Sequence, residues 1–80
     1  MKLPREVSGS ELVRGLCRVG YEQVRQKGEH VQLRTTAPSE HHVTVPLHNP
    51  IKVGTFAAIL SAVAGHLQID RDKLLKRIKL

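Results

Sequence analysis

The sequence predicts an α+β fold, a two-layer α-β-β-β-α sandwich in which helices cover one face of a three-stranded antiparallel sheet. Three observations predict it. An amphipathic helical pattern comes first, alternating patterns follow between residues 21 and 47, and a second helical pattern begins near residue 54. At 80 residues the chain is expected to form one domain, residues 1–80.

The first helix is expected at about residues 9–19. Ser8 and Glu11 have the S-x-x-E spacing of a capping box, and Gly20 suits the position after a helix end. Apolar residues recur on one side of this helix, namely Leu12, Val13, Leu16, Cys17 and Val19. Cys17 is therefore expected to pack on the core side rather than to act as a nucleophile.

Residues 21–36 are expected to form a β-hairpin around a two-residue loop, Lys27-Gly28, because glycine readily adopts the positive φ that tight hairpin turns need. In this register Val24 lies opposite Val31 on the apolar face. Gln26 with Glu29 and Glu22 with Leu33 share that side, and the pairs on the opposite, polar face are Arg25 with His30, Gln23 with Gln32, and Tyr21 with Arg34.

A third strand is expected at residues 42–47, after a turn around Pro38. Its alternation places Val43, Val45 and Leu47 on the apolar face and leaves His42 on the polar face. The sheet thus has one face for helices and one rich in Arg, His and Gln.

The second helix is expected to begin at Gly54 or Thr55 and to end at Gly65. Its apolar stripe consists of Phe56, Ile59, Leu60 and Val63. Asp70 then begins a last short helical segment, with Leu74, Leu75 and Ile78 among basic residues.

The charge favours polyanion partners. The chain has 13 Lys or Arg, 7 Asp or Glu and a formal charge of +6. The basic excess lies in residues 1–34 and 70–80, and such a balance favours nucleic acid. Tyr21 and Phe56 are the aromatic residues, which argues against a platform for stacking single-stranded bases.

Several classes of protein are excluded or disfavoured. No apolar run approaches the ~20 residues of a membrane span, and the first residues, MKLPRE, lack the apolar core of a signal peptide. One cysteine forms no internal disulfide, so a reducing cytoplasm is expected. Motifs for phosphate loops, zinc proteases and serine hydrolases are absent from the sequence.

Of the five histidines, His30 has the setting best suited to chemistry. It follows the glycine turn on the polar face, with Arg25 across the hairpin and Lys27 in the turn. A histidine exchanges protons near neutral pH, and flanking cations would hold a phosphate. The alternative is a solvated polar residue on an exposed strand.

The other histidines have plainer interpretations. A zinc site built from His41, His42 and His48 is disfavoured, because adjacent strand residues point to opposite faces and thiolate partners are missing. His48 is expected to bond within the loop between two prolines, and His66 to lie at the end of the second helix, where a cation complements the helix dipole. No metal or other cofactor is expected.

Three motifs in order resemble those of the HicA (YcfA-like) toxin family. They are QKGEH at residues 26–30, HVTVPLH at 42–48 and IKVGT at 51–55, the last followed by a helix. The resemblance extends from about Ser8 to Val63. It implies a fold similar to the double-stranded-RNA-binding domain, metal-independent cleavage of mRNA, and neutralisation by a HicB-like antitoxin.

The family's catalytic histidine, in a G-S-H motif, corresponds to His30. This chain departs from the motif because Glu29 stands where the family usually has serine. A carboxylate there would repel a substrate phosphate and weaken activity, an effect softened if the two side chains point apart.

The leading hypothesis is a toxin that cleaves mRNA with His30 as the acid/base group. The candidate RNA-binding residues are Arg25, Lys27, Gly28 and Arg34. The group that carries the second proton is left open between Tyr21, Lys27, His42 and water. The alternative is a non-catalytic module of the same fold that binds RNA or the antitoxin.

Overall fold

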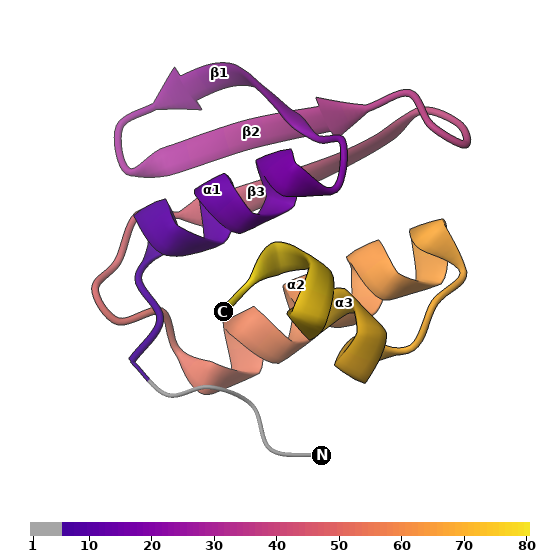
Figure 1. Cartoon of the computed structure of the whole chain (residues 1–80). Helices are drawn as coiled ribbons and strands as arrows, with labels where there is room; N and C mark the ends of the chain where they lie inside the picture. Colours follow the sequence, from indigo (N-terminus) through magenta and orange to yellow (C-terminus); the bar gives the residue numbers. More distant parts are fainter. Residues whose placement is uncertain (1–5) are drawn as a thin grey trace.

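The computed structural model describes residues 6–80 and contains three helices and three strands (Figure 1). Their order is α1 (Gly9–Arg18), β1 (Glu22–Lys27), β2 (His30–Thr35), β3 (His41–Pro46), α2 (Val53–Leu67) and α3 (Arg71–Ile78). Residues 1–5, which contain most of the segment that argued against a signal peptide, lie outside the described residues.

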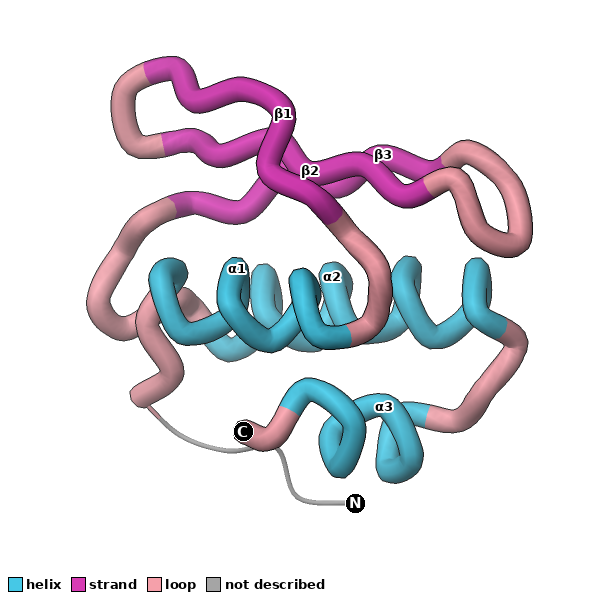
Figure 2. The backbone as a smooth tube through the Cα atoms, turned by 45° about the horizontal axis from the view of Figure 1, so that its top comes forward, coloured by secondary structure: helices cyan, strands magenta, loops and turns pink. Residues whose placement is uncertain are grey.

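The three strands form an antiparallel sheet in the order β1-β2-β3, with both hairpins connecting neighbours. Figure 2 shows α1 and α2 side by side beneath one face of this sheet, with α3 on the far side of the helical layer. The predicted α+β architecture is confirmed. Its polar sheet face is left without a covering helix among residues 6–80.

Helix α1 begins as predicted. The Glu11 amide donates to Ser8 Oγ at 3.1 Å, and the Ser8 amide donates to Glu11 Oε1 at 3.2 Å, which completes the capping box. The helix buries Gly9, Leu12, Gly15 and Leu16, whereas Cys17 is exposed. The prediction that Cys17 packs on the core side was wrong, because the buried side of the helix is centred on Leu12, Gly15 and Leu16, and α3 approaches it at Gly15, where a Cβ would lie 3.0 Å from Ile78 Cβ.

The hairpin loop is Gly28-Glu29, one residue later than predicted, and Lys27 pairs with His30. Gly28 has a φ of 58° at the first loop position. The favoured two-residue turns require positive φ at that position, so the predicted loop would have forced it on Lys27. The observed loop gives the strained position to glycine.

A β-bulge follows between Gln23 and Arg25, which pair with Leu33 and Gln32. Val24 is the extra residue; it is 48% exposed and does not pack on Val31 as predicted. The later loop alone would place Gln23 opposite Arg34, and the bulge shifts the register back by one residue, so Glu22, rather than the predicted Tyr21, lies opposite Arg34. Tyr21 is instead in the core, only 2% exposed.

The core lies between the sheet and the helices. Val31 and Leu33 of β2 and Val43 and Val45 of β3 are buried, as the alternation predicted. The helices contribute most of the other large buried side chains, namely Leu12, Leu16, Phe56, Ile59, Leu60, Val63, Leu74 and Ile78. This core fixes which residues of β2 and β3 point outward.

Helix α2 extends past Gly65, which was predicted to end it, to Leu67. Gln68 adopts the left-handed conformation at φ 57°, and its amide donates to the Ala64 and Gly65 carbonyls. Asp70 then caps α3, accepting from the Lys73 amide at 2.7 Å. The predicted stripe is confirmed at Leu74 and Ile78, which are buried, and Leu75, which is partly buried.

No individual helix within residues 6–80 has the length and apolar character to cross a membrane. Helices α2 and α3 meet those criteria only when they are taken together, and they are bent by 99° at their break.

Candidate functional site

The exposed face of the sheet carries the side chains that the sequence singled out. His30, Gln32 and Arg34 alternate along β2 with the buried Val31, Leu33 and Thr35, and all three are exposed. Residues paired across antiparallel strands share a face. The partners on this face are Lys27, Arg25 and Glu22 of β1 and Pro46, Thr44 and His42 of β3.

His30 is the first residue of β2 and lies directly opposite Lys27, the last residue of β1. Directly opposed residues have Cβ atoms about 4.5–5.5 Å apart, so the imidazole and the ammonium are close enough to contact one phosphate. Both residues are exposed. On the other side His30 pairs with Pro46.

Arg25 was predicted opposite His30, and the structure places it opposite Gln32 instead. It remains on the same face, two pairs along the hairpin from Lys27 and His30. Arg34 is four residues from His30 along β2, about 13 Å at the usual rise per residue. The outer face of the first two strands therefore carries Lys27 and Arg25 near His30, and Arg34 further along, opposite Glu22.

Gly28 lies in open space at the hairpin tip, where an added Cβ would have no neighbour within 4 Å. Its carbonyl accepts a hydrogen bond from Gln26 Nε2 at 3.2 Å. Glycine is needed here for its positive φ, and it also leaves the backbone beside Lys27 open to a ligand.

Glu29 and His48 meet beside His30. Glu29 Oε2 lies 3.6 Å from His48 Nε2, with both side chains substantially exposed. The Leu47 amide donates to the Glu29 carbonyl at 2.6 Å, and the Gly9 amide donates to the His48 carbonyl at 2.9 Å. The first bond fixes the chain beyond β3 against the hairpin loop, and the second fixes it against the start of α1.

His48 was expected to bond within its own loop, but its side chain also reaches Glu29 at the hairpin tip. The available signal was the length of β3: since Pro46 lies opposite His30, the residues after Pro46 must pass the loop at Glu29. His48 therefore joins the candidate site as a second imidazole at its edge.

His42 lies at the other end of the exposed face, opposite Arg34. Its Nε2 is 2.7 Å from Glu40 Oε2. The hydrogen bond to His42 and the charge of that imidazole lower the pKa of the Glu40 carboxyl, with a smaller contribution from Arg34. His42 is thus part of a separate exposed pair, about four strand residues from His30.

Tyr21, His41 and His66 form a second cluster, which the sequence analysis did not foresee. The Tyr21 hydroxyl is hydrogen-bonded to His41 Nδ1 at 2.7 Å, and the rings of His41 and His66 stack at 4.4 Å with an angle of 11°. Burial raises the pKa of Tyr21 to about 12. Burial, then the charges of His66 and His42, lower the pKa of His41. His66 Nε2 is buried and has no hydrogen-bond partner among residues 6–80.

The residues named for the alternative zinc site do not converge. His41 pairs with buried Thr35 at the inner face, His42 points to the outer face, and His48 lies at the hairpin tip. Within residues 6–80 no three His, Cys, Asp or Glu side chains are grouped as metal ligands.

Comparisons with known proteins identify the family. Searches of curated proteins and of solved structures returned no match. The family model described as the HicA toxin of bacterial toxin-antitoxin systems matches residues 9–65. That range is more than half of the chain and includes all three strands with the His30 hairpin, so the chain belongs to the HicA toxin family.

Proposed function

We propose that this HicA-family toxin is an endoribonuclease that cleaves mRNA with His30 as its acid/base group. One observation carries the proposal: His30 is exposed directly opposite Lys27, on the face that also carries Arg25 and Arg34. A proton carrier beside fixed cations is what transfer at a phosphate requires. Family membership supports the toxin role and an antitoxin partner.

The reaction follows from the chemistry of RNA. The neutral imidazole of His30 takes the proton of a ribose 2′-hydroxyl, and the 2′-oxygen attacks the adjacent phosphorus. Negative charge develops on the five-coordinate phosphorus, where the Lys27 ammonium and the Arg25 guanidinium stabilise it. The P–O5′ bond then breaks, a proton is donated to the departing 5′-oxygen, and the products are a 2′,3′-cyclic phosphate and a 5′-hydroxyl.

The proton for the leaving oxygen needs a second source. Tyr21 is buried and hydrogen-bonded to His41, and His42 lies about 13 Å along the face from the His30 pair. Lys27 and His48 are the proton-carrying side chains at the His30 end of the sheet. The proposal therefore assigns the second proton to Lys27, to His48 or to water held by them.

The test incubates purified protein with end-labelled RNA in EDTA and compares the parent with His30→Ala. Loss of an acid/base group lowers the rate by about 10² or more, and the exposed position of His30 leaves the fold intact. His42→Ala is the matched control, since it removes an exposed histidine at the other end of the same face. Equal cleavage by the parent and His30→Ala would refute the assignment.

A second candidate function is favoured by Glu29, whose carboxylate lies beside the His30 site and 3.6 Å from His48. Negative charge at that position opposes the binding of a scissile phosphate. A module that binds RNA without cleaving it would give salt-sensitive binding and no cut product in the same assay.

The proposed partner for neutralisation is a HicB-like antitoxin that covers the exposed sheet face around His30. Since mRNA is the proposed substrate, we place the toxin in the cytoplasm. A complex in which His30 and Lys27 remain open to solvent would contradict neutralisation by occlusion.

A further inference from the structure

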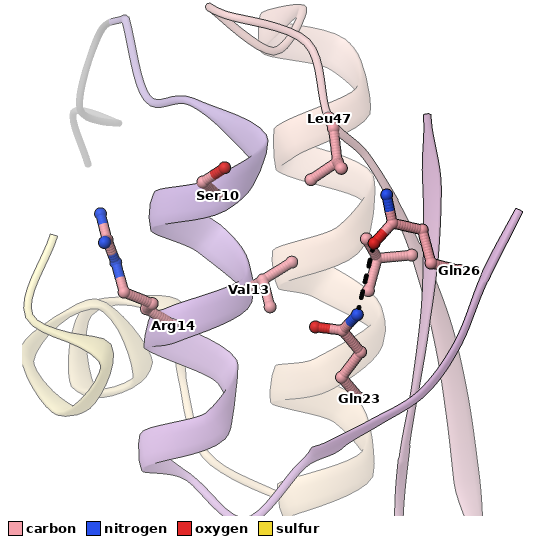
Figure 3. A pocket seen from close by; sticks show the side chains of 7 residues that line it. Ser10, Val13, Arg14, Gln23, Gln26 and Leu47 are labelled. Carbon is pink, nitrogen blue, oxygen red and sulfur yellow. Dashed lines mark hydrogen bonds between the residues drawn. The ribbon is translucent and has the colours of Figure 1, made fainter. Parts of the chain in front are cut away.

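A groove lies on the other side of the hairpin, between β1 and α1 (Figure 3). Its volume is about 250 Å³, below the roughly 300–1,000 Å³ of pockets for drug-sized ligands. The lining residues are Ser10, Val13, Arg14, Gln23, Gln26, Val31 and Leu47. A single ring system is therefore the size of ligand that suits it.

The β-bulge gives this groove its polar wall. Gln23 and Gln26 pair with the buried Leu33 and Val31, so both point to the helix side of the sheet. Figure 3 shows the two glutamines across from Val13 of α1, with Leu47 at one end. The groove thus combines an apolar floor with two carboxamides at its edge.

The carboxamides are held loosely. Gln23 Nε2 donates to Gln26 Oε1 at 3.5 Å, the upper limit of a hydrogen bond, and Gln26 Nε2 donates to the Gly28 carbonyl at 3.2 Å. Both residues are exposed. A ligand can replace the longer bond at little cost. Arg14 extends from the other side of α1, away from the glutamines (Figure 3).

The groove is continuous with the proposed reaction site around the free edge of β1. Gln26 directly precedes Lys27, and Leu47 directly follows Pro46, which lies opposite His30. Successive strand residues point to opposite faces about 3.4 Å apart along the strand. A single RNA strand that crosses this edge can place a phosphate at Lys27 and a neighbouring base at Gln26.

We propose that the groove binds one adenine base of the RNA that is cleaved at His30, and that Gln23 and Gln26 thereby set a base preference near the cut. The inference rests on the proposed function. Glutamine carboxamides donate to N7 and accept from N6 of adenine in a bidentate pair. The apolar floor of Val13, Val31 and Leu47 would cover the face of the ring.

The experiment cleaves an RNA pool of random sequence and sequences the ends of the products. The parent is expected to cut preferentially with adenine at a fixed position within a few nucleotides of the scissile bond. In the double variant Gln23→Ala, Gln26→Ala that preference should fall about tenfold, the scale of one lost bidentate base contact. Ser10→Trp, which places a ring over the rim from an exposed helix position, should reduce it without removing either glutamine.

Gln32→Ala is the matched control, because Gln32 is an exposed glutamine of the same hairpin on the opposite face. It should leave the adenine preference unchanged, whatever its effect on the overall rate. Circular dichroism of each variant verifies that the fold is retained.

The two proposals fail in different ways. Cleavage with no adenine preference in the parent, or with the preference intact in both groove variants, overturns the base site and leaves the endonuclease standing. If the parent cuts no RNA, the endonuclease proposal fails, and the groove is tested by titrating AMP, CMP, UMP and ribose 5-phosphate against His30→Ala protein. NMR shifts of the Gln23 and Gln26 side-chain amides with AMP alone would support it, and their absence with AMP would overturn it.

Discussion

His30 and His41 begin consecutive antiparallel strands and therefore lie at opposite ends of one sheet. His30 is on the outer face, exposed, with Lys27 as its neighbour. His41 is at the inner face, partly buried between the Tyr21 hydroxyl and the ring of His66. A polyanion can therefore reach the histidine at one end, His30, whereas the histidine at the other end, His41, contacts other side chains of the protein.

The strand face on which a histidine lies, rather than the presence of histidine, decides which imidazole is available for chemistry. An exposed histidine beside cations can exchange protons with a bound ligand. A histidine whose nitrogen is already bonded to a buried hydroxyl contributes to stability, and its protonation costs stability. Substitutions at the His41 end should accordingly change the free energy of unfolding, and substitutions at the His30 end should change the rate of RNA cleavage.

The largest effect on stability is expected for Tyr21→Ala. Removing a large buried aromatic side chain typically costs about 3–5 kcal/mol, and Tyr21 is only 2% exposed. The free energy of unfolding in urea should fall by that amount. Tyr21→Phe, which removes only the hydroxyl bond to His41, should cost about 0.5–1.5 kcal/mol. An unchanged urea midpoint in Tyr21→Ala would show that this end of the sheet contributes little to stability.

At the other end, Lys27→Ala should lower kcat/KM for RNA about tenfold and reduce the slope of log affinity against log salt by about one, because one phosphate contact is lost. Stability should stay within about 0.5 kcal/mol of the parent, since Lys27 is exposed. Lys76→Ala, an exposed position on α3 behind the helical layer, is the control and should change neither quantity. Equal losses of kcat/KM in Lys27→Ala and Lys76→Ala would indicate that the total positive charge, rather than a phosphate contact at Lys27, determines the rate.

The stability of the His41 end should depend on pH. The pKa of His41 in the folded chain is lowered below the ordinary 6.5 by burial and by the charges of His66 and His42. The contribution of neutral His41 to the free energy of unfolding is fully present above pH 6.5. It is lost as the pH falls through the lowered pKa that His41 has in the folded chain. Urea unfolding of the parent between pH 7.5 and 5 should show this loss.

His41→Gln should flatten that pH dependence, whereas His30→Ala should keep it. A profile that is identical in the parent and in His41→Gln would place the titrating group elsewhere.

The smallest effect is expected for Glu29→Ser. Removing a carboxylate beside the phosphate site relieves a repulsion of about 1 kcal/mol at 4 Å in water, so kcat/KM should rise a few-fold, most at low ionic strength. Glu40→Ser removes a carboxylate paired with His42 at the other end of the face and is the matched control. A fall in activity with Glu29→Ser would mean that the Glu29–His48 pair assists the reaction.

The architecture and the exposed row of β2 could be predicted from sequence, because strict alternation of apolar residues in β2 and β3 fixes both faces. The details of β1 could not. Its pattern is nearly featureless, all six residues are exposed, and the bulge at Val24 changes which residues face the helices. The turn chemistry of Gly28 was the signal that would have corrected the register.

Contacts between segments that are distant in the sequence could not be predicted either. His41 and His66 are 25 positions apart, and their stacking depends on where α2 ends, which was misplaced because Gln68, rather than Gly65, takes the left-handed conformation. His48 was missed for a similar reason, since its approach to Glu29 depends on the path of the chain after β3.

The most direct test measures RNA cleavage in EDTA and urea unfolding on the same preparations of His30→Ala and His41→Ala. We expect His30→Ala to lose about 10²-fold or more in cleavage rate with an unchanged urea midpoint. We expect His41→Ala to be less stable but, where folded, to cleave RNA near the parental rate. Cleavage that survives in His30→Ala and is lost in folded His41→Ala would contradict these expectations.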